Sequence, residues 1–371
     1  MSDDANTPGE KPPSLTRGDA LIRLAAIGAV VLVVAGSFGY TGGWLSPDRL
    51  TPARMVDMFE QVNGPHPGFR RNHAKGVCVA GSFDSNGRGV RLSKAAVFAP
   101  GSVPVIGRFA LAGGQPYAAD ASRIVRSLAL RFALPDGEEW RTGMNDIPVF
   151  AVNTPEGFYE QLAASRPDPA TGKPDPARMA EFLAKHPETA RATQTIQRQP
   201  ISSGFDDAAY NSLDAFRFVN AAGISVPVRW SMMPVQPFVG ADAAQPTESD
   251  PNYLFDTVIA RIDRQKLQWH LVVTIGKPTD PTNDATIAWP AGREQVDVGT
   301  LTIDRVESEA NGACRDVNFD PLVLPAGIES SDDPLLAARS AAYSQSFTRR
   351  AGEIKEPSAV TPAETRKGAG S

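Results

Sequence analysis

Short apolar runs alternate with turn residues through most of the chain from Arg70 onward. Each run is rich in β-branched or aromatic residues and ends near glycine, proline or aspartate, which is typical of β-strands joined by tight connections. The predicted strands are Gly76–Phe83, Ala95–Phe98, Pro104–Leu111, Ser127–Leu134, Pro148–Asn153, Ala215–Val219, Ser225–Trp230, Leu267–Gly276 and Gln295–Ile303. So many short strands predict an antiparallel barrel that is closed to remove its edges.

Helical spacing is found in only a few segments of this part of the chain. Thr51–Val62 begins with a threonine cap and a proline and then has apolar residues at helical spacing, so it predicts a short amphipathic helix. A second helix is expected at Ala177–Lys185, inside a proline-rich charged segment. Ser330–Arg350 starts with a capping cluster and continues with an alanine-rich body, which predicts a third helix. The fold class is therefore α+β, a barrel with helical inserts.

An apolar segment precedes this body. Leu24–Tyr40 has no charged residue and is just long enough to cross a bilayer as a helix. Lys11, Arg17 and Arg23 precede it, so the positive-inside rule keeps the N-terminus in the cytoplasm and sends the rest outward. The segment is an uncleaved signal anchor or a signal peptide, and a buried core helix is the alternative. We expect a periplasmic or extracytoplasmic protein, anchored to the inner membrane by residues 24–40.

These patterns divide the chain into four parts. Residues 1–19 are polar and proline-containing and are predicted to be a disordered cytoplasmic lead. Residues 20–44 hold the signal anchor or signal peptide, and residues 45–352 form the main domain. The polar residues 353–371 are predicted to be a disordered tail.

Composition limits the classes of function. The net charge of −5 gives no basic surface, so we expect no nucleic-acid partner. The two cysteines, Cys78 and Cys314, are far apart and form no zinc motif. In an exported protein they could form one disulfide, and two buried thiols are the equal alternative. A homo-oligomer is compatible with the sequence, which does not define the oligomeric state.

Two segments carry the candidate chemistry. In the segment from Arg70 to Gly76, His73 lies between basic residues at the start of a predicted strand, where a purely structural role is the alternative. On the predicted C-terminal helix, Arg339 lies one turn before Tyr343, on a stripe that also carries apolar side chains. A neighbouring guanidinium favours phenolate, which is a ligand for ferric iron. The alternative is an amphipathic helix with a snorkelling arginine and a half-buried tyrosine.

Five motifs, taken in order, give the chain a resemblance to the haem catalase superfamily. The motifs are Arg70-x-x-His73-Ala-Lys-Gly76, Gly107-Arg108-Phe109, Met144-Asn145-Asp-Ile-Pro-Val-Phe150, Phe319-Asp-Pro-Leu-Val-Leu-Pro-Ala-Gly-Ile328 and Arg339-x-x-x-Tyr343. The chain is most similar to the short bacterial catalase-related peroxidases. The resemblance implies a catalase-like closed antiparallel β-barrel with helical inserts, preceded here by one N-terminal transmembrane or signal helix, and haem b as cofactor.

The resemblance also implies a role for each motif residue. His73 matches the distal acid–base histidine and Asn145 the distal asparagine. Tyr343 matches the axial ligand of the iron, and Arg339 matches the arginine paired with that tyrosine. The other residues that would hold the haem are Arg70, Arg108 and Arg350 at its propionates and Phe158 against its face.

The chain departs from the family pattern in two places. Ala110 stands where catalases have a serine that can hydrogen-bond the distal histidine, so the sequence does not show what orients His73. The segment after Tyr343 reads Ser-Gln-Ser rather than Pro-Asp-Thr. The chain is also shorter than the larger catalases, and we expect a more accessible haem for that reason.

The function implied is the reduction of hydrogen peroxide or organic peroxides by a small organic electron donor, with weak catalase activity. His73, expected to titrate near neutral pH, would move a proton from one peroxide oxygen to the other, and Asn145 would donate a hydrogen bond to the peroxide. The alternatives are an exported haem-binding or peroxide-sensing protein with little turnover, and a haem-dependent enzyme that rearranges lipid hydroperoxides. A membrane-anchored ligand-binding barrel without haem is a further class.

Overall fold

The computed structural model describes residues 17–42, 44–45, 49–241, 250–363 and 365. The chain divides into two compact units, Met1–Thr51 and Pro52–Ser371. The first unit holds helix α1 (Arg17–Thr41), which is long and apolar enough to cross a membrane, a test that a signal sequence also passes. Within this unit, Gly39 is the one residue of α1 that is buried. Helix α1 begins at Arg17, so it includes the last three residues of the predicted lead, residues 1–19. The first sixteen residues of that lead lie outside the described residues.

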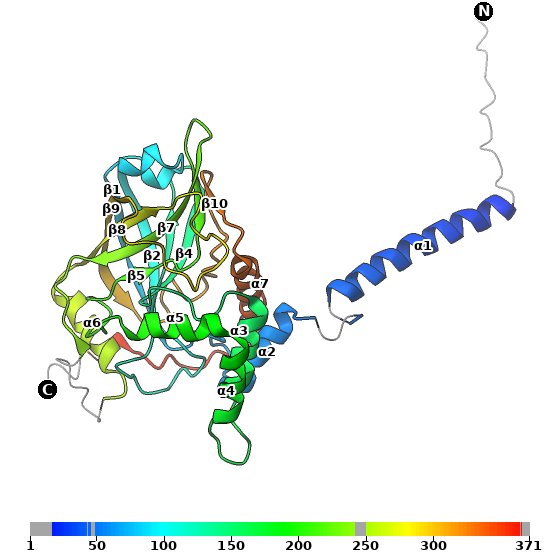
Figure 1. Ribbon diagram of the computed structural model, residues 1–371, viewed down its shortest axis with the longest axis horizontal. Helices are drawn as coiled ribbons and strands as arrows, with labels where there is room; N and C mark the ends of the chain where they lie inside the picture. Colours follow the sequence, from blue (N-terminus) through cyan, green and yellow to red (C-terminus); the bar gives the residue numbers. More distant parts are fainter. Residues whose placement is uncertain (1–16, 43, 46–48, 242–249, 364, 366–371) are drawn as a thin grey trace, which may run out of the picture. The chain divides into compact units, whose positions relative to one another are not determined.

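A closed antiparallel barrel forms the centre of the second unit (Figure 1). Its strands follow one another in the order β7–β5–β4–β3–β2–β1–β9–β8, and the pairing of β8 with β7 closes the ring. Strands β6 and β10 extend the sheet beyond β7. The bounds are β1 Gly76–Ser85, β2 Gly101–Leu111, β3 Arg126–Ala133, β4 Glu139–Asn145, β5 Tyr210–Asn211, β6 Phe216–Val219, β7 Ser225–Pro234, β8 Leu267–Ile275, β9 Gln295–Glu307 and β10 Ile328–Ser330. The predicted closed barrel is confirmed.

Aromatic side chains fill the interior of the barrel. Alternate residues of each strand point inward, and on β3 these include Leu128, Leu130 and Phe132, all fully buried. Phe132 stacks on Trp140 with ring centroids 4.8 Å apart, and Trp140 meets Trp230 edge-on at 5.1 Å. Since packed interiors leave few voids, a ligand pocket of any size must lie outside this barrel.

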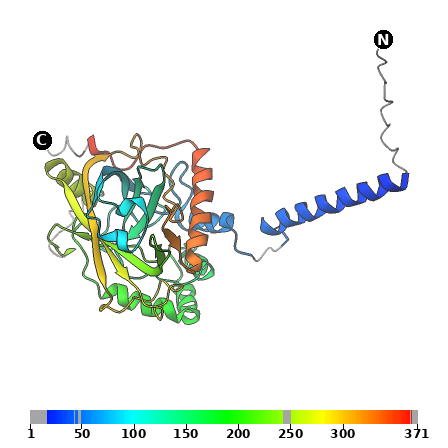
Figure 2. The same ribbon diagram turned by 90° about the horizontal axis from the view of Figure 1, so that it is seen from above.

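Helices cover the outside of the barrel. Their bounds are α2 Pro52–Asn63, α3 Pro155–Ser165, α4 Pro176–Lys185, α5 Pro187–Gln197, α6 Tyr253–Arg264 and α7 Pro334–Ala351. The three predicted helices correspond to α2, α4 and α7. Asp333 caps α7 by accepting a hydrogen bond from Leu335 N at 2.9 Å, and Pro334 follows the cap. Helix α7 runs alongside the barrel, and α2 and α3 contact it there (Figure 2).

Some predicted elements are wrong. Ala95–Phe98 forms the 3₁₀ helix η2 (Ala96–Phe98), and Pro148–Asn153 contains no strand. Both segments have the apolar composition of a strand, but neither pairs with a neighbour. Strand β4 was not predicted, because only Trp140 and Met144 of its seven residues are large and apolar. Helices α3, α5 and α6 also had no predicted counterpart.

The described part of the C-terminal segment after α7 packs against the rest of the second unit. Glu353 accepts hydrogen bonds from Gly68 N at 2.7 Å and Arg71 Nη1 at 3.0 Å. Further on, Val360 is 1% exposed, and Thr365 donates to Asp256 at 2.6 Å. The predicted disorder of residues 353–371 is therefore wrong for 353–363, because specific contacts anchor a segment whose composition is polar. Residues 364 and 366–371 lie outside the described residues.

The two cysteines form a disulfide, with Cys78 of β1 and Cys314 joined at an S–S distance of 1.98 Å. This decides between the two alternatives that the sequence left open. The bond closes a loop of 236 residues and fastens the segment before β10 to the barrel wall. A cross-link over so long a loop restricts the unfolded chain strongly.

We expect Cys78→Ala/Cys314→Ala to lower the free energy of unfolding by roughly 2–5 kcal/mol, because the unfolded chain regains the entropy that the cross-link removed. Denaturant titration of the oxidised wild type, the reduced wild type and the double variant measures the loss. Equal midpoints for the three, with thiol titration showing that the bond is absent in two of them, would contradict a stabilising role.

Candidate functional site

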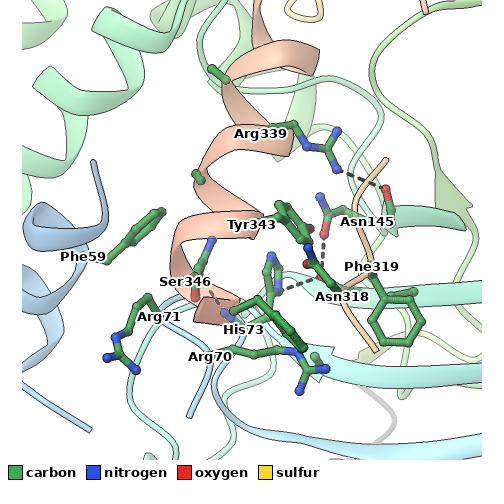
Figure 3. A pocket seen from close by; sticks show the side chains of 18 of the residues that line it. Phe59, Arg70, Arg71, His73, Asn145, Asn318, Phe319, Arg339, Tyr343 and Ser346 are labelled. Carbon is green, nitrogen blue, oxygen red and sulfur yellow. Dashed lines mark hydrogen bonds between the residues drawn. The ribbon is translucent and has the colours of Figure 1, made fainter. Parts of the chain in front are cut away.

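A cavity with about 1350 Å³ of empty space, part of it open to solvent, lies outside the barrel (Figure 3). Its lining comes from strands β2, β3 and β4, from helices α2, α3 and α7, from the segment before β1, and from the loops that carry Asp214 and Phe319. Every residue with a predicted role lines it, namely Arg70, His73, Arg108, Asn145, Phe158, Arg339, Tyr343 and Arg350. The fold thus brings residues 280 positions apart in the sequence into one cavity, from Arg70 to Arg350.

The floor of the cavity is the outer face of three neighbouring strands. Two rows of paired residues cross it, Ala110–Ser127–Asn145 in one and Arg108–Ala129–Gly143 in the next. The residues between them along each strand point into the barrel core, as Phe109 and Leu128 do. Since three of the six outward residues are alanine or glycine, the wall leaves room for a flat group against it.

Helix α7 supplies the opposite side of the cavity. Figure 3 shows Arg339 and Tyr343 projecting from it toward the site of Asn145 and His73. Tyr343 Oη and Arg339 Nη2 both lie close to the wall, since a Cβ added to Gly143 would be 3.5 Å and 3.6 Å from them. The phenol and the guanidinium therefore lie side by side against the wall at Gly143.

Arg339 is held by a carboxylate that the sequence analysis did not identify. Its Nη1 donates to Asp214, and its Nη2 donates to Gly143 O at 3.4 Å. Burial acts to lower the pKa of Arg339, but Asp214 and Tyr343 outweigh it and raise that pKa. Burial and the nearby Asp214 also raise the pKa of Asp333, at the start of α7, to about 7. Arg339 is therefore a fixed positive charge beside the Tyr343 phenol.

His73 has a strained backbone that local contacts hold in place. Its φ of 55° lies in the left-handed region, and Asn72 Oδ1 accepts hydrogen bonds from His73 N and Gly113 N, both at 2.9 Å. Arg108 donates to His73 O at 2.8 Å and to Ala74 O at 3.1 Å. The backbone before β1 is thus fastened to β2.

Burial, together with the charges of Arg108 and Arg339, lowers the pKa of His73 to about 3. The pKa of His73 therefore lies below the near-neutral value expected from the sequence, because the ring is buried and arginine charges lie near it. The imidazole is neutral at pH 7 and is able to accept a proton.

Ser127 is the side chain that is hydrogen-bonded to the His73 ring, which also interacts with the backbone of Leu111. The Ser127 Oγ lies 3.0 Å from His73 Nδ1 and also hydrogen-bonds Asn145 Oδ1. Ser127 pairs across the β2–β3 ladder with Ala110, the position at which the sequence lacked a serine. The hydroxyl next to His73 therefore comes from β3 in this chain, whereas the family pattern has it on β2. It could have been identified from the sequence only if the pairing register of the two strands had been known.

Three arginines and one glutamate form a charged cluster at one end of the cavity. Glu309 pairs with Arg70 and, at 2.7 Å, with Arg108 Nη2. Arg70 Nη2 also donates to the carbonyls of Cys314 and Val317 at 3.1 Å and 3.0 Å, and Arg350 Nη1 donates to Arg315 O at 2.6 Å. Three positive charges and one negative charge leave the cluster with a net charge of +2. Glu309 was not predicted, since it lies in none of the motifs.

Burial opposes the ionisation of Glu309, but Arg108 and Arg70 outweigh it and lower its pKa. Burial also lowers the pKa of Arg70 to about 9 and is the main cause of a lower pKa at Arg350. The cluster therefore gains from any further negative charge that reaches it.

Comparison with known proteins places this site in a family. The family profile "Catalase" matches residues 50–360. The chain belongs to the catalase family. A "Catalase-related peroxidase" of Synechococcus elongatus is 37% identical over 330 residues, which cover 89% of this chain and 95% of that protein. A "Catalase-related peroxidase" of Mycolicibacterium paratuberculosis is 34% identical over 304 residues, or 82% and 96% of the two chains. A solved bacterial catalase, 23% identical, shares the fold with a TM-score of 0.69 over 77% of this chain and 58% of its own.

Proteins of the catalase family depend on haem, and the cavity fits that group. Among the described residues, no three His, Cys, Asp or Glu side chains are grouped so that they could hold a bare metal ion. The small residues Ala110, Ala129 and Gly143 of the wall, the net charge of +2 at one end and the ring of Phe158, 5.5 Å from that of Phe150 between centroids, suit a flat apolar ring with two carboxylates.

Glu309→Gln should lower the free energy of unfolding of the haem-free protein at pH 7 by about 1–3 kcal/mol, because it leaves buried arginines without their carboxylate. Since folding lowers the pKa of Glu309, its contribution is present above the usual glutamate pKa of about 4.3 and is lost as pH falls through the folded value. The difference between variant and wild type should therefore shrink below pH 4.

Glu294→Gln is the matched control, because Glu294 pairs with Arg91 at the surface, where both side chains are more than half exposed. Denaturant unfolding at several pH values provides the comparison. A Glu309→Gln curve that coincides with the Glu294→Gln curve at pH 7 would show that the cluster does not need its carboxylate.

Proposed function

We propose that this protein is a haem-dependent peroxidase that reduces hydrogen peroxide or organic peroxides with a small organic electron donor and has weak catalase activity. The observation that carries the proposal is the meeting of His73, Asn145, Arg339 and Tyr343 in one cavity of a catalase-family chain. The two curated relatives named catalase-related peroxidases match nearly their whole length to this chain, which supports a peroxidase rather than a catalase.

Haem b is the cofactor that we assign to the cavity. Tyr343 would bind the iron through its phenolate oxygen, and Arg339 would balance that negative charge. Phe158 would lie against the ring, while Arg70, Arg108 and Arg350 would bind the two propionates, whose two negative charges would balance the net charge of +2 of the cluster. When bound, haem supplies the iron at which the O–O bond of the peroxide is cleaved.

In this proposal His73 transfers a proton between the peroxide oxygens, and Asn145 hydrogen-bonds the peroxide. The neutral imidazole accepts a proton from one peroxide oxygen and returns it to the other, which is then released as water or an alcohol. Asn145 donates a hydrogen bond through its amide nitrogen and exchanges no proton. Burial and the charges of Arg108 and Arg339 lower the pKa of His73, so the ring is neutral and can accept that proton.

We further propose that the catalase-like haem peroxidase domain, residues 45–352, works outside the cytoplasm, in the periplasm or an equivalent compartment. Helix α1 would anchor it to the inner membrane through residues 24–40 if the segment is not cleaved. The Cys78–Cys314 disulfide supports this location, because such bonds persist in oxidising compartments.

Tyr343→Phe should abolish or shift the haem absorption band of the purified full-length protein, because phenylalanine cannot bind iron. Tyr117→Phe is the matched control, since the Tyr117 hydroxyl bonds Pro357 O at the surface and lies outside the cavity. If the spectrum of Tyr343→Phe equals those of the wild type and the control, Tyr343 is not the axial ligand.

His73→Ala should keep the haem and lower kcat/KM for hydrogen peroxide by roughly 10²–10⁴-fold, the usual contribution of general acid–base catalysis. His270→Ala, in strand β8 and away from the cavity, should leave the rate unchanged. Steady-state assays with a phenolic donor measure both. A wild type that binds haem but turns over no faster than His73→Ala would instead indicate a haem carrier or peroxide sensor.

A further inference from the structure

We propose that Ser127 is a positioning residue that sets, through one hydroxyl, both the ring tautomer of His73 and the amide orientation of Asn145. The inference rests on the proposed peroxidase function, in which these two groups face the peroxide. It assigns a role to a position outside the motifs that identified the family.

The geometry that supports it is a three-membered chain of hydrogen bonds. Ser127 Oγ lies 3.0 Å from His73 Nδ1 and hydrogen-bonds Asn145 Oδ1. Ser127 and Asn145 face each other in the β3–β4 ladder, so their side chains lie on the same outer face of the sheet. Among the described residues, no other side chain is hydrogen-bonded to both groups. Ser127 is 7% exposed, which leaves little access for a water molecule that could replace it.

A single hydroxyl proton links the states of the two groups. The amide oxygen of Asn145 can only accept, so the Ser127 hydroxyl donates to it. With its proton used there, Ser127 Oγ can only accept from His73, and Nδ1 must therefore carry the ring proton. The Nε2 atom of a neutral ring is then unprotonated and can take a proton from a peroxide. The amide nitrogen of Asn145, turned away from Ser127, is free to donate.

The opposite arrangement would disable both groups at once. If Asn145 presented its amide nitrogen to Ser127, the hydroxyl would donate to His73 Nδ1 and the ring proton would be on Nε2. The cavity would then receive an acceptor from Asn145 and a donor from His73, the reverse of what peroxide activation needs. Ser127 therefore couples the two orientations, so that they are correct together or wrong together.

The Ser127 hydroxyl on β3 replaces the serine hydroxyl that is missing at Ala110 on β2. Ala110 and Ser127 are paired residues on β2 and β3, so a hydroxyl on either can approach the ring of His73 from the same wall. On β3, however, the hydroxyl is also next to Asn145 of β4, whereas Ala110 is one strand further away. The position on β3 is the one that can serve both groups.

Ser127→Ala in the full-length haem-loaded protein tests the proposal. We expect kcat/KM for hydrogen peroxide to fall about tenfold, the effect of one lost hydrogen bond, with haem content and melting temperature unchanged. The association rate of cyanide should fall by a similar factor, because hydrogen cyanide must leave its proton on a base before the anion binds iron. Ser127→Thr, which keeps the hydroxyl, should restore most of both rates.

The double variant Ala110→Ser/Ser127→Ala separates the two contacts. It should restore cyanide association, which needs His73 alone, more fully than peroxide turnover, which also needs Asn145. Ser231→Ala is the matched control, since Ser231 Oγ bonds an asparagine oxygen, Asn211 Oδ1, at 2.7 Å in the same sheet but outside the cavity.

The proposal is wrong if Ser127→Ala slows both reactions no more than Ser231→Ala does. It is also wrong if the loss of rate follows a loss of haem or of thermal stability that Ser127→Thr does not reverse, which would show a structural role. A wild type that binds cyanide quickly but does not turn over peroxide would refute the proposed function alone, because the effect of Ser127→Ala on cyanide association would still test the positioning role.

Discussion

The pairing register of β2, β3 and β4 is the constraint on which the rest of the site depends. Because side chains alternate between the faces of a strand, this register places Ala110, Ser127 and Asn145 in one row outside the barrel while Phe109 and Leu128 fill the core. A slip of one residue would move the whole row to the other face. Closure of the ring by β7 and β8 and the packed aromatic interior prevent that slip, so the stability of the barrel also fixes the geometry of the cavity.

The site also depends on the pairing of its buried charged side chains. Buried arginines are costly unless they are paired, and here Glu309, Asp214 and backbone carbonyls supply the partners. The Cys78–Cys314 bond fastens the segment whose carbonyls accept from Arg70, so the disulfide supports the arginine cluster as well as the fold. The remaining net charge of +2 in this cluster and the positive charge of Arg339 beside Tyr343 are the features on which the proposed binding of haem rests.

The sequence predicted the closed barrel, the main helices and every motif residue that the fold brings into the cavity. It did so because strand alternation and helix caps are local patterns, and because each motif keeps its residues together. It could not predict Ser127, Glu309 or Asp214, whose partners lie on other segments. Ser127 depends on the strand register, Glu309 on the disulfide-tethered segment that brings it to Arg108, and Asp214 on the docking of α7. The same limit explains the ordered segment around Glu353, whose partner Arg71 is 282 positions away.

The most direct test of this account is a crystal structure of the full-length protein loaded with haem. We predict the iron bound to Tyr343 Oη, with His73 and Asn145 on the opposite face of the ring and the propionates among Arg70, Arg108 and Arg350. Iron bound by His73, or haem outside the cavity lined by β2–β4 and α7, would contradict the account.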